Sequence, residues 1–162
     1  MAVTPWVIRP LQLLLVTLFV AFVGAQVLLI LGSTMLVPAG SPELERFRWA
    51  VLLAAGLGLV CLQVVLVATW RLLGLVRSDR IFRPGALPWV DAIVVALVMA
   101  WVILLAAAMP VLQFAQADDA PGLGGLHLML LLVAAVPVLM MLVMRTLLRR
   151  ATALTTDLEG VV

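Results

Sequence analysis

Metal binding and covalent catalysis need side chains that this sequence hardly contains. It has one histidine, His127, and one cysteine, Cys61, and they lie in different apolar runs. A metal site needs several His, Cys, Asp or Glu ligands that converge. Covalent catalysis needs a nucleophile beside a base. The sequence therefore predicts no catalytic residue, no metal, no cofactor and no enzyme activity.

His127 is the side chain with the most possible chemical roles. One imidazole can serve as an axial haem ligand or as a sensor of pH. The simpler interpretation is a histidine at a wet helix end, bonded to water or to Asp118 or Asp119, and we favour it. Trp101 lies well inside an apolar run, and we expect it to pack against a neighbouring helix rather than to bind a ligand.

Composition indicates the solvent that surrounds these residues. Hydrophobic residues make up 66% of the chain and charged residues 11%, whereas a soluble domain has about 45–50% and about 25%. So much apolar surface cannot be hidden from water in 162 residues. The net charge is only +2, so we expect no direct binding of nucleic acid.

Four apolar runs are long enough to cross a bilayer, which takes about 20 helical residues. Lipid offers no partner for exposed backbone groups, so each run must be helical. The expected spans are residues 11–31, 49–70, 87–109 and 126–144. Ser41-Pro42-Glu43 suits the start of the second helix, which we expect to continue beyond the membrane toward Arg77. The prolines and glycines of residues 110–125 predict an outer turn region.

Orientation follows from the arginines, since the chain has no lysine. Eight of the ten fall on one side of the predicted spans, and the positive-inside rule places that side in the cytoplasm. These are Arg9, Arg71, Arg77, Arg80, Arg83, Arg145, Arg149 and Arg150. The Arg-, Ala- and Leu-rich composition hints at a GC-rich bacterial genome, and hence at the bacterial inner (plasma) membrane.

The predicted fold is therefore all-α: a polytopic membrane protein with four transmembrane helices in a compact bundle and both termini cytoplasmic. Residues 1–162 form a single membrane domain with a cytoplasmic loop, 71–86, and a cytoplasmic tail, 145–162. We expect the tail to continue helically to about Leu158. Residues 155–162 either fold back against the Arg77–Phe82 turn or stay mobile.

A few polar residues and one proline are candidates for structural roles inside this bundle. Gln26 and Gln63 can hydrogen-bond across the first two helices, and Pro137 is expected to kink the fourth. Asp91 lies about one turn into the third helix. We expect it to be ionised and to pair with an arginine of the preceding loop, which contains Arg77, Arg80 and Arg83.

Two segments carry a resemblance to a known family. They are Arg-Ser-Asp-Arg-Ile-Phe-Arg-Pro-Gly-Ala-Leu-Pro-Trp-Val-Asp at residues 77–91 and Leu-Thr-Thr-Asp-Leu-Glu-Gly-Val-Val at residues 154–162. Both resemble a bacterial family of four-helix membrane proteins, the domain of unknown function 2975 family. Its members have no established activity, and some are encoded beside a small helix-turn-helix regulator. The resemblance implies a membrane partner or regulator, by analogy only.

Two functions remain open at this point. The first is a non-enzymatic regulator, sensor or accessory subunit that acts through protein contacts. The alternative is a small oligomeric transporter or channel, because four spans this apolar make no polar pore alone. Membrane lipid is an expected partner in either case. The other candidate partners are a membrane protein, a cytoplasmic protein or a second copy of this chain. The candidate cytoplasmic interaction surface comprises Arg77, Arg80, Ile81, Phe82, Arg83, Asp157 and Glu159.

Overall fold

Four long helices account for nearly all of the structure. A computed structural model describes residues 5–35, 42–77, 87–117 and 119–159. The helices are α1 (Pro5–Met35), α2 (Pro42–Arg77), α3 (Leu87–Ala117) and α4 (Pro121–Glu159). Each is long and apolar enough to cross a membrane. The all-α class and the four membrane-spanning helices are confirmed, and with them the multi-pass membrane character.

Proline marks most of the helix starts. It is the first residue of α1, α2 and α4 and the second of α3. A proline there costs little, because the first N–H groups of a helix have no acceptor within the helix. The start of α2 at Pro42 and its extension to Arg77 agree with the sequence prediction. So does the continuation of α4 to Glu159, which shows that the chain does not fold back before that residue.

The outer turn between α3 and α4 is much shorter than predicted. Helix α3 does not end at residue 109: it continues through Pro110 to Ala117. Helix α4 begins at Pro121, five residues before the predicted start. Pro110 removes one backbone hydrogen bond, to the carbonyl of Ala106. The extra turns offset that loss by packing, because Val111 and Ala115 are buried.

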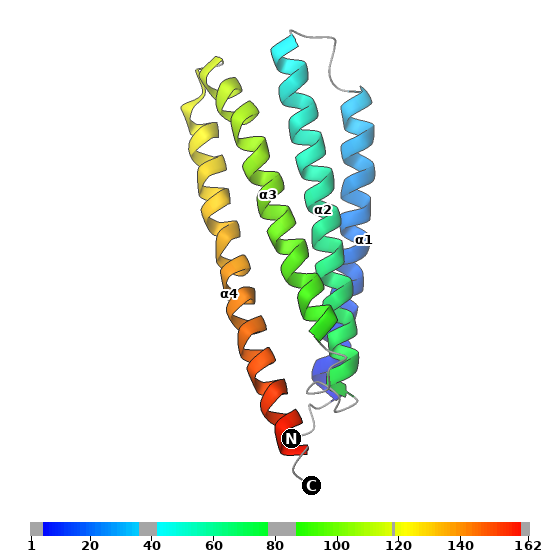
Figure 1. Cartoon of the computed structure of the whole chain (residues 1–162). Coiled ribbons are helices and arrows are strands. Elements are labelled where there is room, and N and C mark those ends of the chain that lie inside the picture. Colours follow the sequence, from blue (N-terminus) through cyan, green and yellow to red (C-terminus); the bar gives the residue numbers. More distant parts are fainter. Residues whose placement is uncertain (1–4, 36–41, 78–86, 118, 160–162) are drawn as a thin grey trace.

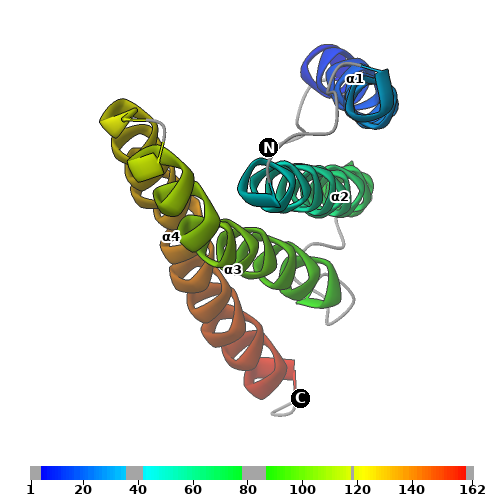
Figure 2. The same cartoon turned by 90° about the horizontal axis from the view of Figure 1, so that it is seen from above.

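The helices stand in an open row rather than a closed ring. The extensive contacts are those of α1 with α2, α2 with α3, and α3 with α4. Figure 1 shows the first turn of α1 and the last turns of α4 at the same end of the molecule. Viewed from above, α1 and α4 lie on opposite sides of α2 and α3, and α4 runs obliquely across α3 (Figure 2).

The best-packed helix is α3, because its contacts with α2 and with α4 are the two most extensive in the row. Most of the buried side chains of the described residues belong to it. They are Val90, Ile93, Val94, Ala96, Ala107, Val111 and Ala115. Helix α4, by contrast, packs mainly on α3 and leaves most of its apolar surface exposed. In a membrane, that surface faces lipid or another protein.

Candidate functional site

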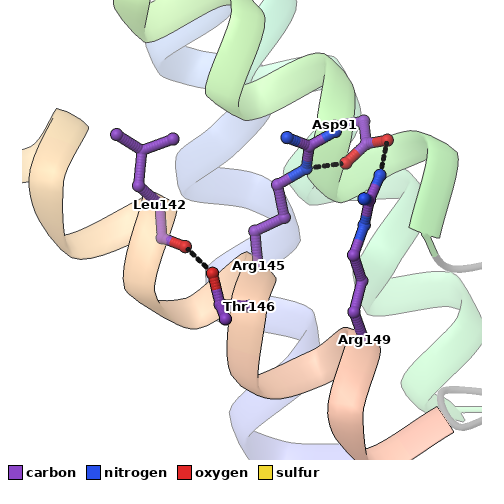
Figure 3. A network of polar contacts seen from close by, with 5 residues as sticks. All are labelled: Asp91, Leu142, Arg145, Thr146 and Arg149. Atoms are coloured by element: carbon purple, nitrogen blue, oxygen red, sulfur yellow. Dashed lines mark hydrogen bonds and ion pairs between the residues drawn. The ribbon is translucent and has the colours of Figure 1, made fainter. Parts of the chain in front are cut away.

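The clearest polar cluster lies where α3 begins and α4 leaves its apolar stretch. The Asp91 carboxylate of α3 accepts two hydrogen bonds from arginines of α4 (Figure 3). Arg145 Nε lies 2.5 Å from Oδ1, and Arg149 Nη2 lies 3.4 Å from Oδ2. The side chains of Asp91 and Arg145 are each 33% exposed, and that of Arg149 is 56% exposed. The cluster is thus open on one side.

Local helix geometry explains why both arginines reach one carboxylate. Arg145 and Arg149 are four residues apart, so they lie on the same face of α4, one turn from each other. Asp91 is one turn into α3, where the helix dipole favours a negative charge. Two guanidinium groups on one carboxylate leave the cluster with a net positive charge. It can hold α3 against α4 and attract an anion.

Asp91 therefore has partners that were not expected. Its counterion was expected in the loop that precedes α3, but the arginines that contact it come from the last part of α4. Arg80 and Arg83 lie outside the described residues, as does the side chain of Arg77.

A second arginine contact joins α2 to the same end of α3. The Arg71 guanidinium carbon lies 5.4 Å from the ring centroid of Trp89, within the range of a cation–π interaction. Trp89 and Asp91 are two residues apart, so they project from different sides of α3. One side thus contacts an arginine of α2, and the other contacts the arginines of α4.

Two side chains bond α3 and α4 reciprocally nearer the outer turn. The indole Nε1 of Trp101 donates to the carbonyl of Leu131, at 3.1 Å. His127 Nε2 lies 3.1 Å from the carbonyl oxygen of Leu104. A carbonyl only accepts, so this ring nitrogen must carry the hydrogen. The expected packing of Trp101 against a neighbouring helix is confirmed, whereas the partner of His127 is α3 rather than Asp119.

The predicted glutamine pair joins α1 to α2. Gln63 Nε2 donates to Gln26 Oε1 at 3.1 Å, and Gln26 Nε2 donates to Gln63 Oε1 at 3.4 Å. The exchange satisfies one donor and one acceptor of each amide, which matters where lipid offers no replacement. Pro137 lies inside α4, which continues on both sides of it. The kink expected there stays a prediction.

A cavity of about 590 Å³ lies between α3 and α4 at the outer turn. His127, Asp119 and Gln116 supply its polar groups, and the rest of the lining is apolar or glycine. Across residues 5–35, 42–77, 87–117 and 119–159, no three His, Cys, Asp or Glu side chains are grouped to hold a metal ion. The cavity therefore lacks the ligands of a metal site.

The predicted cytoplasmic interaction surface is not brought together in the described part of the chain. Arg80, Ile81, Phe82 and Arg83 lie outside it. Only the backbone is described for three further members, Arg77 at the end of α2 and Asp157 and Glu159 in the last turns of α4.

Residues 38–162 match the family model described as "Protein of unknown function (DUF2975)". This chain belongs to that family. The match covers α2, α3 and α4, and so includes Asp91, Trp89 and the arginines that contact them. It confirms the resemblance seen in the segments at residues 77–91 and 154–162. No curated protein and no solved structure matches the chain.

Sequence reasoning missed the partners of Asp91, although a signal for them exists. Asp91 precedes the outer turn at Asp119 by 28 residues (119 − 91), and Arg145 follows it by 26 (145 − 119). Two antiparallel helices that rise equally per residue bring such positions to a similar depth. Counting outward from the turn would have paired them. The turn predicted at residues 110–125 has nearly the same centre, so this signal is present in the sequence even with those bounds.

Proposed function

We propose that this DUF2975 protein is a non-enzymatic plasma-membrane protein that acts through contacts with a partner's transmembrane helix. Its role would be that of a regulator, sensor or accessory subunit, with the arginine-rich end in the cytoplasm. The observation that carries the proposal is the outward face of α4. Among the described residues, this helix packs mainly on α3, and no other helix makes extensive contact with it.

The exposed residues of α4 include a stripe with the spacing of a helix-packing seam. Leu132, Val136, Leu139 and Val143 are separated by four, three and four residues, and each is 60–65% exposed. Apolar residues at that spacing face one side of a helix and suit interdigitation with another helix. A second transmembrane helix would pack on this side of α4, as α3 packs on the opposite side.

Site-specific photo-crosslinking in native membranes tests this proposal. A photoreactive residue replaces Val136 in the stripe or, as the matched control, Val20 on α1, which is also 63% exposed. We expect a protein adduct from position 136 and only lipid adducts from position 20. Lipid adducts alone from both positions would contradict the proposal. An adduct containing two copies of this chain would instead favour the oligomeric transporter or channel.

A further inference from the structure

Two adjoining apolar grooves lie along α2 toward the arginine-rich end of the row. The first, of about 210 Å³, is lined by Leu15, Val16 and Phe19 of α1 and Leu66, Val67 and Trp70 of α2. The second, of about 250 Å³, shares Phe19 and Val67 with the first and reaches Trp89 of α3. Together they form one surface across three helices, which is apolar except for the Gln63 amide.

Arginines border the end of this surface where α1 begins and α2 ends. Arg71 directly follows Trp70, and its guanidinium lies over the Trp89 ring, 5.4 Å from the centroid. Arg9 is exposed and precedes Val16 by seven residues, so it lies on the same face of α1, two turns nearer the helix start. Both positive charges thus lie beyond the same end of the grooves.

These two arginines differ from Arg145 of α4 in their charge balance. Arg145 is held by the Asp91 carboxylate. Within the described residues, no carboxylate contacts Arg9 or Arg71. A pair of guanidinium groups at the end of an apolar groove is complementary to a molecule with an anionic head and a hydrocarbon tail.

We propose that this surface binds one anionic phospholipid. An acyl chain lies in the grooves against Phe19 and Val67, and the phosphate lies between Arg71 and Arg9. Guanidinium groups bind phosphate oxygens through paired N–H donors. The stacking of Arg71 on Trp89 holds that donor at the membrane border. A zwitterionic lipid binds less well, because its own ammonium group compensates the phosphate charge.

Native mass spectrometry of the full chain in detergent tests the proposal. The bound fractions of phosphatidylglycerol and of phosphatidylcholine with the same acyl chains are compared in separate titrations. We expect the wild-type chain to prefer phosphatidylglycerol. Arg71→Gln and Arg9→Gln should each lower that preference about fivefold. Arg150→Gln is the matched control, since Arg150 is exposed at the same end but lies on α4, away from the grooves.

The Arg150→Gln chain should keep the wild-type preference for phosphatidylglycerol over phosphatidylcholine. Equal losses from Arg150→Gln and Arg71→Gln would mean that diffuse surface charge attracts the lipid, and would overturn the proposal. Equal binding of both lipids by the wild-type chain would do the same.

The contribution of the grooves is tested separately. Val67→Trp places a large ring in both grooves and should lower the binding of both lipids, while circular dichroism checks that helix content is kept. Soluble glycerol 3-phosphate carries the same phosphate without a chain, so it should not compete at concentrations where the lipid binds. Competition by glycerol 3-phosphate, or full lipid binding by a folded Val67→Trp chain, would show that the site recognises a phosphate alone, and the lipid proposal would be wrong.

Discussion

At the scale of single residues, three charged side chains join α3 to α4. Asp91 contacts Arg145 and Arg149, which are one turn apart on α4, through a different carboxylate oxygen each. An exposed ion pair contributes only about 0–1 kcal/mol. Here the pair is partly covered, with the side chains of Asp91 and Arg145 each 33% exposed.

We predict that Asp91 and Arg145 are energetically coupled. Asp91→Asn and Arg145→Gln should each lower thermal stability in detergent, and the double variant should lose less than the sum of the two. The coupling should be about 0.5–1 kcal/mol in a double-mutant cycle. The cycle of Asp91 with Arg149 should give less, because that contact is longer, at 3.4 Å, and Arg149 is more exposed. Additive losses for Asp91 and Arg145 would show that the pair adds no stability.

A polar side-chain contact could be predicted from the sequence where both partners lie inside apolar spans. The Gln26–Gln63 contact follows because an amide in lipid has few alternatives to another amide. The partners of Asp91 could not be predicted in the same way. Arginines occur both in the loop before α3 and at the end of α4, and proximity in sequence favours the loop, whereas equal distance from the outer turn favours α4.

At the scale of elements, the hairpin of α3 and α4 depends on a compact turn. Asp119 has φ = 49°, in the left-handed region. The N–H of Ala120 donates to the carbonyl of Ala115 at 2.9 Å, the six-to-one bond of a Schellman motif. Pro121 then begins α4. Close by, a Cβ added at Gly124 would lie 3.1 Å from Leu112 Cδ2, so glycine permits the close approach of the two helices.

Position 119 should respond to backbone preference rather than to charge. Asp119→Gly should keep or raise thermal stability, because glycine adopts positive φ without steric cost. Asp119→Val should lower it by about 1–2 kcal/mol, since a β-branched side chain is poorly tolerated there. Ala117→Val, at an exposed helical position, measures the ordinary cost of adding valine. If Asp119→Val costs no more than that control, the left-handed turn is not required.

The sequence predicted helix starts better than it predicted this turn. Prolines at Pro42 and Pro88 mark starts because their missing N–H has no acceptor there in any case. Pro110 carries the same local signal but lies within α3, where packing of Val111 and Ala115 offsets the lost hydrogen bond. Local preference could not reveal that packing, so the turn was predicted over residues 110–125 although only residues 118–120 separate the two helices.

At the scale of the whole molecule, the four helices form a row with two different outer faces. The α1 side presents apolar grooves that end near Arg9 and Arg71, and the α4 side presents an apolar stripe. The number of helices followed from apolar run length alone. Their order in space did not, because lipid-facing and helix-facing residues are equally apolar, and hydropathy does not tell them apart.

The claim on which the functional proposals rest is that both ends of the chain and its arginine-rich end face the cytoplasm. Thiol labelling of intact cells tests it most directly, with single cysteines in a Cys61→Ser background. Ser41→Cys and Ala120→Cys should react with a membrane-impermeant reagent from outside. Ser78→Cys and Thr155→Cys should react only after the membrane is permeabilised. Labelling at positions 78 and 155 on intact cells, with 41 and 120 protected, would invert the topology and contradict the account.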